Sequence, residues 1–309
     1  MGFCRYGASR VLILFRTYPK ENDMLRIVAT LMGCVIFSAA TYAKTSDIEA
    51  SNNQIMFQAV STYVDYTETG NGILNTKTGI LDTETGWVPG FGISVSSMQD
   101  TQLRLTPCFP CFFKKEYFRF AYDYYKGETK YTGSLLSGGS YGSVVTTSSA
   151  LINDLNLRSG SAYSFGDRMM LTPYLELGYH LWDRGVNYGE TYTHNHYGLG
   201  ALGQYTPFSK LVFSVNALIG RTFGSHITVN SGPAFTGFSG ALGNSSLYKA
   251  GLSADYGFSE RLHGNISIDY TSFSYGISSL FNIGGGYVAW EPDSTTKYKT
   301  VRVGIGYAY

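Results

Sequence analysis

Charged residues are scarce in this sequence. Lys, Arg, Asp and Glu make up 15% of the 309 residues, and the formal net charge is +1. A typical globular domain carries about 25% charged residues. The chain has no run of Lys or Arg and no zinc-ligand spacing, and the glycines of Gly284–Tyr287 do not sit between a strand and a helix. The sequence therefore gives no support for binding of nucleic acid, zinc or nucleotide phosphates.

Long apolar runs are almost absent as well. The longest is Ile27–Ala43, which follows a basic segment ending at Arg26 and closes with the tripeptide TYA. A basic start, a short apolar core and a cleavage-type ending are typical of a secretory signal peptide. The run is shorter than the ~20 residues that cross a bilayer comfortably, which disfavours the alternative of a transmembrane anchor.

This signal predicts the organisation of the chain. We expect residues 1–23 to be an N-terminal extension, residues 24–43 to be the cleaved signal peptide, and residues 44–309 to be a single mature domain. Lipoprotein-type cleavage at Leu31–Cys34 is an alternative, disfavoured because the apolar core before it would be very short. No second long apolar run follows, so the mature sequence offers no candidate for a helical membrane span.

Cysteine is the third scarce residue type. Two of the four cysteines, Cys4 and Cys34, lie in the presequence, and Cys108 and Cys111 lie in the sequence PCFPC. A redox-active pair with this spacing normally opens a helix next to a strand, whereas this pair lies in a connection rich in Pro and Phe. We expect either a local disulfide in an oxidising compartment or no bond.

Aromatic residues and glycine are abundant instead. The chain has 26 Tyr, 19 Phe and 37 Gly, a composition that favours strands over helices. In the last ten residues, TVRVGIGYAY, large apolar side chains alternate with Arg, Gly and Ala. Such a period of two predicts a strand with two different faces. About ten segments of this kind follow one another, many roughly 10 to 14 residues long, whereas strands of soluble sheets average about 5 to 6.

The connections between these segments alternate in length. Short turns are expected at Ser159–Asp167, Thr206–Lys210 and Ser259–Arg261. Long polar loops are expected at Thr67–Thr85, Gly127–Ser143, Ser225–Leu242 and Ile277–Lys297. Two connections break the alternation, because Met98–Lys114 is long and Asp183–Tyr188 is short.

The second face of the expected strands distinguishes a barrel from a soluble sandwich. A sandwich would turn many Lys, Glu and Thr to water, but this face is mostly Gly, Ser, Ala and Tyr with single charges of both signs. A narrow barrel lumen suits that mixture, because small residues fit there and opposite charges pair. We expect a lumen ionic network of Arg119, Asp123, Asp154, Arg158, Glu176, His180, Asp255, Asp269 and Arg302.

With these features, residues 54–309 resemble bacterial outer-membrane β-barrel proteins, in particular the small OmpA-type and opacity-type barrels. The resemblance implies an all-β, transmembrane, up-and-down antiparallel barrel of about ten strands, with eight or twelve as alternatives, located in the bacterial outer membrane. It implies outer-membrane lipid and the barrel-assembly machinery as partners, and no cofactor. In this class, an alternating last strand ending in an aromatic residue is the insertion signal. The residues that match it are Val301, Val303, Ile305, Tyr307 and Tyr309, with Tyr309 in place of the usual Phe.

Three functions fit such a barrel. The first is a structural or adhesive role, in which Gly/Ser/Tyr-rich surface loops bind an unknown extracellular ligand. The second is a small porin-like diffusion channel. The third is a surface enzyme, either an omptin-like protease or a lipid-modifying barrel.

The sequence assigns no catalytic or metal-binding residue, and we expect the protein not to be an enzyme. Candidates for a protease site are Asp183, His194, His196 and His226, but the omptin Asp–Asp and Asp–His pairs and a Gly-x-Ser-x-Gly motif are absent. We expect His194 and His196 to be polar residues on an exposed strand end. We expect His180 and Glu176 to belong to the structural network.

Overall fold

The structure is a computed structural model that describes residues 47–72, 78–100, 115–134, 139–233 and 236–309. The described elements all belong to one compact unit. The predicted extension and signal peptide lie outside the described residues and stay predictions. Cys108 and Cys111 lie outside them as well, so both alternatives, a local disulfide and no bond, stay open.

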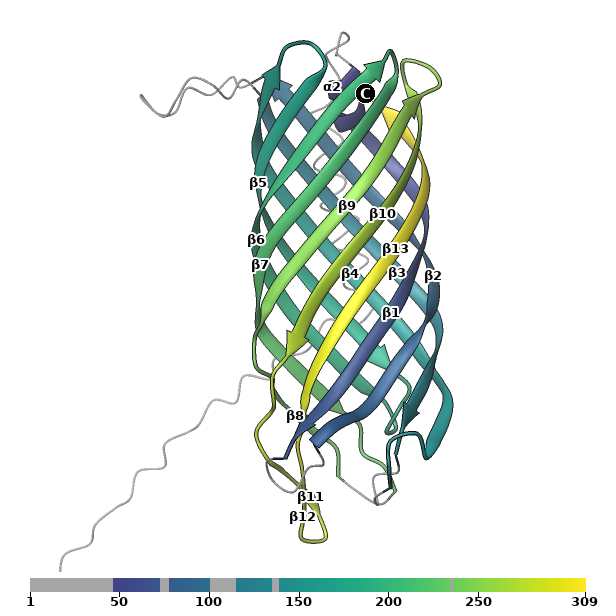
Figure 1. Ribbon diagram of the computed structural model, residues 1–309, viewed down its shortest axis with the longest axis vertical. Coiled ribbons are helices and arrows are strands. Elements are labelled where there is room, and N and C mark those ends of the chain that lie inside the picture. The colour runs from purple at the N-terminus through teal and green to yellow at the C-terminus, as the bar shows by residue number, and fades with distance from the viewer. Residues whose placement is uncertain (1–46, 73–77, 101–114, 135–138, 234–235) are drawn as a thin grey trace, which may run out of the picture. The chain divides into compact units, whose positions relative to one another are not determined.

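Ten long antiparallel strands close into a barrel (Figure 1). Each strand pairs with its neighbours along the chain, β6 pairs with β7, and β1 pairs with the last strand over sixteen residue pairs. The predicted all-β, up-and-down architecture and strand number are confirmed. The barrel strands are β1 (Gln54–Asn71), β2 (Thr78–Asp100), β3 (Lys115–Gly133), β4 (Val144–Phe165), β5 (Met169–Arg184), β6 (Glu190–Phe208), β7 (Leu211–Val229), β9 (Ser246–Gly257), β10 (Leu262–Tyr275) and β13 (Asp293–Ala308).

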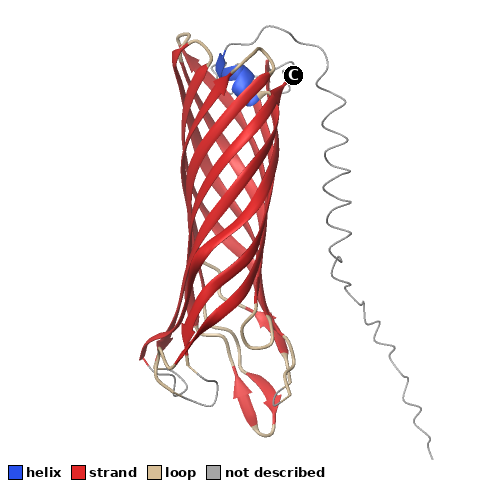
Figure 2. Cartoon of the chain, turned by 90° about the vertical axis from the view of Figure 1, so that its right-hand side faces the viewer, coloured by secondary structure: helices blue, strands red, loops and turns tan. Residues whose placement is uncertain are grey.

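The two rims of the barrel differ. An even number of strands brings the start of β1 and the end of β13 to the same rim, here named the terminal rim, at the top of Figure 1. The other rim, the loop rim, carries two smaller features. A short strand β8 (Phe238–Ala241) extends the sheet beside β7, and a hairpin of β11 (Phe281–Gly284) and β12 (Tyr287–Ala289) projects from the rim (Figure 2).

Several strands are longer than the apolar alternation predicts. The expected loop Thr67–Thr85 is mostly strand, because β1 continues to Asn71 and β2 begins at Thr78. The expected turn Ser159–Asp167 is likewise mostly β4. Toward the loop rim the outward side chains become Thr, Glu and Lys, so the apolar pattern stops while the backbone ladder continues. The short connections after Arg184, Phe208 and Gly257 are as predicted.

The outer face of the barrel has an apolar band. Phe57, Leu199, Ile219 and Ile305 are each more than 60% exposed there. The band is flanked by outward aromatic side chains on both sides. On the loop side these are Tyr63, Trp87, Tyr197 and Tyr248, and on the terminal side Tyr205, Phe213, Tyr256 and Tyr307. An apolar band between two aromatic girdles is the outer surface of a transmembrane barrel.

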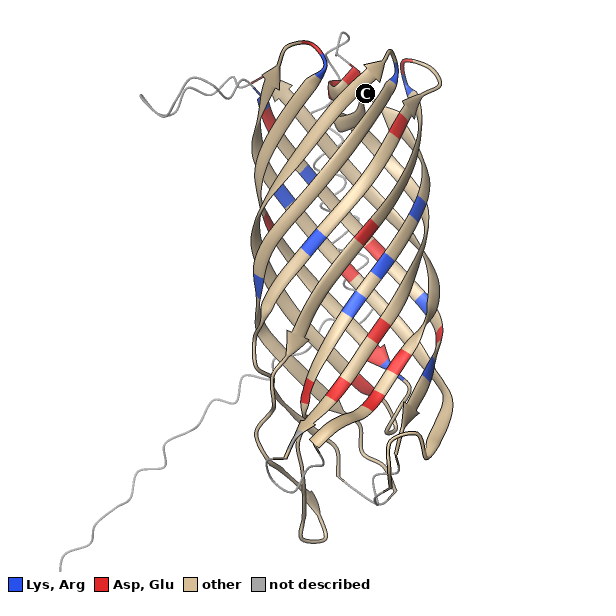
Figure 3. Cartoon of the chain, in the orientation of Figure 1, with Lys and Arg blue, Asp and Glu red and all other residues tan. Residues whose placement is uncertain are grey.

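The barrel continues past this band toward the loop rim. Beyond Trp87 and Tyr63, the outward side chains of β3 and β13 include exposed Lys130 and Lys297. Figure 3 shows that many of the charged residues of β1, β2 and β13 lie in this half of the barrel. The described residues include no helix that is long and apolar enough to cross a membrane.

The apolar band predicts a strong position effect on β13. Val303 is 57% exposed in the band and pairs with Ile266 and Ala59. Val303→Arg places a charge in hydrocarbon and should cost about 2–4 kcal/mol. The matched variant Val303→Leu should be nearly neutral. Urea unfolding in lipid vesicles measures both, and equal stability of the two variants would show that this face does not meet lipid.

Candidate functional site

The barrel interior has three zones along its axis. A short helix lies in the mouth at the terminal rim, a polar cavity occupies the middle, and an aromatic core fills the half toward the loop rim. Ten strands leave so little room that side chains decide whether the lumen is open.

The helix α2 (Asp47–Asn52) forms a plug. It packs against β2, β6, β7 and β9, which come from opposite sides of the barrel, so it crosses the mouth. Asn52 Nδ2 donates a hydrogen bond of 2.6 Å to Gln204 Oε1. Asn53 bonds the backbone of Met98 through both its side-chain atoms, at 2.6 and 2.9 Å. These side-chain bonds fix the segment to two strands of the wall.

The polar cavity has a volume of about 190 Å³, and its lining includes the plug residues Ser51 and Asn52 and the outer aromatic residues Phe273 and Tyr298. Serine, threonine, asparagine and glutamine are the most numerous of its uncharged lining residues. The charged residues that line it are Arg119, Asp123, Asp154, Arg158, Lys249, Asp255, Asp269 and Arg302. All face inward, the orientation predicted from the alternation.

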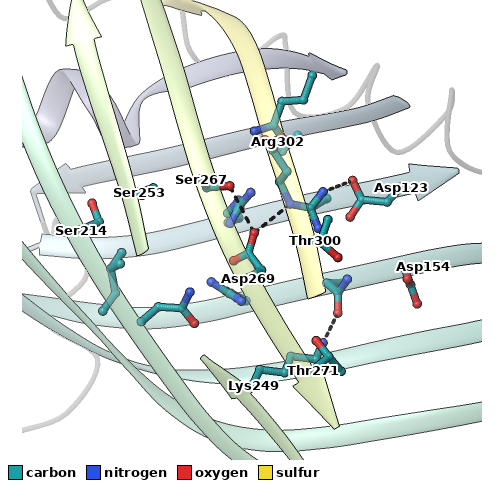
Figure 4. Close-up of a pocket in the computed structure, with 18 of the residues that line it drawn as sticks. Asp123, Asp154, Ser214, Lys249, Ser253, Ser267, Asp269, Thr271, Thr300 and Arg302 are labelled. Carbon is teal, nitrogen blue, oxygen red and sulfur yellow. Dashed lines mark hydrogen bonds and ion pairs between the residues drawn. The ribbon is translucent and has the colours of Figure 1, made fainter. Parts of the chain in front are cut away.

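Arg302 of β13 joins two acidic residues across the cavity wall. Its Nη1 donates to Asp123 Oδ1 at 2.6 Å and its Nε donates to Asp269 Oδ2 at 3.0 Å (Figure 4). Ser267 Oγ also donates to Asp269, at 3.2 Å. One cation thereby ties together β3, β10 and β13, the strands on either side of the barrel closure.

Glu176 of β5 is the centre of a second group. It is almost fully buried, and it accepts hydrogen bonds of 2.6 Å from both Arg158 Nε and Lys249 Nζ. His196 Nε2 lies 3.2 Å from the same carboxylate. Lys249 lies on the inward face of β9, as the alternation along this strand predicts.

Three more histidine side chains make hydrogen-bond contacts in the lumen. His180 Nδ1 bonds Asp154 Oδ1 at 2.6 Å. His263, a partner that the sequence did not indicate, bonds Asp255 Oδ1 at the same distance near the terminal rim. His194 Nδ1 lies 2.7 Å from the hydroxyl of Tyr275. Of the nine residues predicted for the network, eight therefore have an ionic or hydrogen-bonded partner among the described residues, in four separate groups.

Arg119 is the exception. It lines the cavity from β3, yet no hydrogen bond or ion pair joins it to any part of the chain that the structure describes. Its neighbours across the ladder are Ser96 of β2 and Arg158 of β4.

The zone toward the loop rim is a compact core. Tyr66, Ile152, Trp182 and Tyr192 have no exposed surface, and Phe273, Tyr275 and Tyr298 are nearly as buried. The rings of Tyr192 and Tyr275 stack with centroids 5.4 Å apart. This outer core, defined by these seven residues, lies where the barrel extends past the apolar band.

Arg184 is the buried cation of the outer core. Its guanidinium donates to Glu84 Oε2 at 2.6 Å and to Glu190 Oε2 at 3.0 Å, and it lies 4.3 Å from the centre of the Tyr66 ring. Asp82 Oδ1 is 3.6 Å away. Sequence reasoning missed this group because it assigned Asp82 and Glu84 to a loop.

A further carboxyl group caps the outer core from outside the strands. Glu291 lies between β12 and β13 and accepts a hydrogen bond from the hydroxyl of Tyr192. Burial, and then the nearby charge of Glu190, raise the pKa of Glu291 to about 8. This carboxyl group is therefore largely protonated at neutral pH.

The residues considered for a protease site do not come together. His194 and His196 are buried in the lumen, which corrects the expectation that they lie on an exposed strand end. They are buried because the barrel continues past them toward the loop rim. Asp183 instead faces outward, where it accepts a 2.5 Å hydrogen bond from Thr191 Oγ1, and His226 bonds Ser239 on β8. Among the described residues, no group of three or more His, Cys, Asp or Glu could hold a metal ion.

The residues of the predicted insertion signal take two positions. Val301, Val303 and Ile305 point outward into the apolar band and Tyr307 into the aromatic girdle on its terminal side, and all four are between 38% and 63% exposed. Tyr309 follows the end of β13, and its hydroxyl donates a 2.7 Å hydrogen bond to the carbonyl of Ser96. Recognition of these residues by the assembly machinery stays a prediction.

Comparison with known proteins bears on the fold. No family model and no curated protein matches the sequence. Among solved structures, the chain is similar to the outer-membrane protease OmpT from Escherichia coli, with a TM-score of 0.51 and 10% identity over 88% of this chain and 100% of that chain. The translocator domain of the autotransporter NalP from Neisseria meningitidis matches with a TM-score of 0.35 and 13% identity over 93% of this chain and 98% of that chain.

Three observations indicate the same class of protein: the closed strand ladder, the apolar band between aromatic girdles, and the similarity in fold to OmpT. The chain is an outer-membrane β-barrel protein. In such barrels the short turns face the periplasm and the longer loops face the outside. The plug of this outer-membrane barrel is therefore on the periplasmic side, and the outer core and the β11–β12 hairpin are on the extracellular side.

Proposed function

We propose that this outer-membrane barrel is a non-conducting surface protein, whose extracellular loops have a structural or adhesive role. The observation that carries the proposal is the filled lumen. A diffusion channel needs a continuous water path, whereas here the outer core packs fully buried Trp182, Tyr66 and Tyr192 across the interior. The plug blocks the periplasmic mouth independently.

The extracellular hairpin supports a binding role. Its tip turns through Gly284, Gly285 and Gly286, all with positive φ, which other residues rarely adopt. Beside this turn, Tyr287 is 72% exposed and Val288 is 54% exposed. Large apolar side chains presented on a projecting hairpin are a feature of contact surfaces.

Planar-bilayer recording tests the closed lumen. The purified barrel should show no steady single-channel conductance, because the outer core excludes water and ions. Deletion of residues 44–53, which removes the plug, should leave the barrel closed for the same reason. Steady conductance of the intact barrel would contradict the proposal and support the porin-like alternative.

A binding screen tests whether the β11–β12 hairpin is a contact surface. Folded barrel, verified by its altered gel mobility before boiling, is screened for binding to extracellular proteins and glycans. Binding should be lost in the double variant Tyr287→Ser and Val288→Ser and retained in Ile305→Val, which alters only the lipid face. Binding that is unchanged in the double variant would show that the hairpin is not the contact surface.

A further inference from the structure

One part of the cavity wall has more positive charge than its carboxylates balance. Arg119 and Arg158 are direct partners in the β3–β4 ladder, and both face the lumen. Directly opposite side chains have Cβ atoms about 5 Å apart, and like charges in this arrangement repel each other.

The neighbouring carboxylate does not resolve this excess. Glu176 accepts from both Arg158 and Lys249, and Arg119 has no carboxylate bound to it among the described residues, so this wall holds three cations and one carboxylate. Three positive charges less one negative charge leave an excess of two. The other acidic residues of the cavity have partners elsewhere, since Asp123 and Asp269 share Arg302, Asp154 bonds His180 and Asp255 bonds His263. Over the whole cavity, counting Glu176, four Lys and Arg face five carboxylates, so the positive excess is local to this wall.

A guanidinium group in a membrane-enclosed cavity is costly unless it is paired and hydrogen-bonded. Guanidinium groups present several N–H donors in a planar fork that fits carboxylate and phosphate oxygens. Arg158 uses its Nε toward Glu176, and Arg119 uses none of its donors on the described residues. The guanidinium groups of Arg119 and Arg158 therefore both have unused N–H donors, and a single oxyanion between them could accept hydrogen bonds from both.

We propose that the lumen holds a small oxyanion, a phosphate, sulfate or short carboxylate, bound between Arg119 and Arg158. The cavity of about 190 Å³ has room for several water molecules or one such anion. Ser96, directly opposite Arg119 on β2, adds a hydroxyl donor at the same level. Asn156, whose Oδ1 accepts from Lys249 Nζ, keeps its amide N–H groups for the anion. The site is separate from the extracellular loops, so it does not depend on what they bind.

Retention of radiolabelled inorganic phosphate tests the site. The barrel is refolded from urea with labelled phosphate, so that the anion can enter before the plug closes, and is then passed through a desalting column. The wild-type barrel should retain about one phosphate per chain. Arg119→Gln should lower the retained amount at least tenfold, and Arg119→Lys, which keeps the charge and loses the fork, should fall between.

The matched control is Arg221→Gln, which removes an exposed arginine on the outer face of β7. It should retain as much phosphate as the wild type, and equal loss in this variant would mean binding to the outer surface and overturn the proposal. No retention by the wild type, or full retention by Arg119→Gln, would also overturn it. If Arg119→Gln does not fold, as shown by gel mobility, ³¹P spectra of the wild type decide: a shifted phosphate signal supports the site, and a free-phosphate signal alone overturns it.

Discussion

Arg184→Gln should lower the free energy of unfolding of the barrel by about 3–5 kcal/mol, the cost of breaking a buried ion pair by removing one partner. The variant leaves Glu84, which has no exposed surface, and Glu190 without their cation. It also removes the contact of the guanidinium with the Tyr66 ring. Urea unfolding in lipid vesicles, followed by tryptophan fluorescence, measures the change.

Two further variants make this result specific. Arg168→Gln, at an exposed turn of the terminal rim, should change the stability by less than about 0.5 kcal/mol. Adding Glu84→Gln to Arg184→Gln should restore part of the lost stability, because the uncompensated charge is then gone. A cost below about 1 kcal/mol for Arg184→Gln would show that the outer core does not depend on this cation.

The stability of the extracellular end should fall as the pH rises from about 5 to 8. Glu291 has an ordinary pKa of 4.5 when unfolded and about 8 when folded, so across this window the folded state binds the extra proton. Its favourable contribution is complete below the unfolded value and is lost as the pH passes through the folded value. At 1.36 kcal/mol per pKa unit, the loss is on the order of 4 kcal/mol. The groups around Glu291 are Tyr66 of β1, Asp82 of β2, Arg184 of β5, and Glu190 and Tyr192 of β6.

Amide hydrogen exchange at pH 5 and pH 8 measures this loss locally. After correction for the intrinsic exchange rate, protection in β6 and β13 near the loop rim should be lower at pH 8. Glu291→Gln, which mimics the protonated carboxyl group, should remove most of the difference. A pH dependence of the same size in the variant would assign it to other groups of the outer core.

The sequence pattern located the strands better than it located their ends. The expected connections Thr67–Thr85 and Met98–Lys114 left Gly86–Ser97 as the strand between them, and the structure extends this strand in both directions to Thr78–Asp100. In the apolar band, outward residues such as Trp87 and Phe91 contact lipid and must be apolar, so the alternation of apolar and polar residues is visible in the sequence. Past the band, outward Thr83 and Thr85 meet water, and nothing in their hydropathy distinguishes a strand from a polar loop.

The site shows a similar division. The alternation of inward and outward side chains along each strand was sufficient to place Asp123, Glu176 and Arg302 on the inner face. It could not identify their partners, because Asp123 and Arg302 are 179 residues apart and meet only through the register of the closed barrel. The burial of His194 and His196 was missed for a related reason, since it depends on the length of barrel beyond them.

The extension of the strands past the apolar band has a mechanical consequence. Each extracellular loop joins two neighbouring strands, which run on into the membrane without interruption, as β1 and β2 do from Asn71 and Thr78. A pull on such a loop along the barrel axis acts mainly along the strands, while the ladder hydrogen bonds lie across them. Many of these bonds are then loaded in shear at the same time, and the closed ring has no edge strand from which peeling could begin. The part of the barrel outside the apolar band should therefore resist extension when force is applied to the hairpin along the barrel axis.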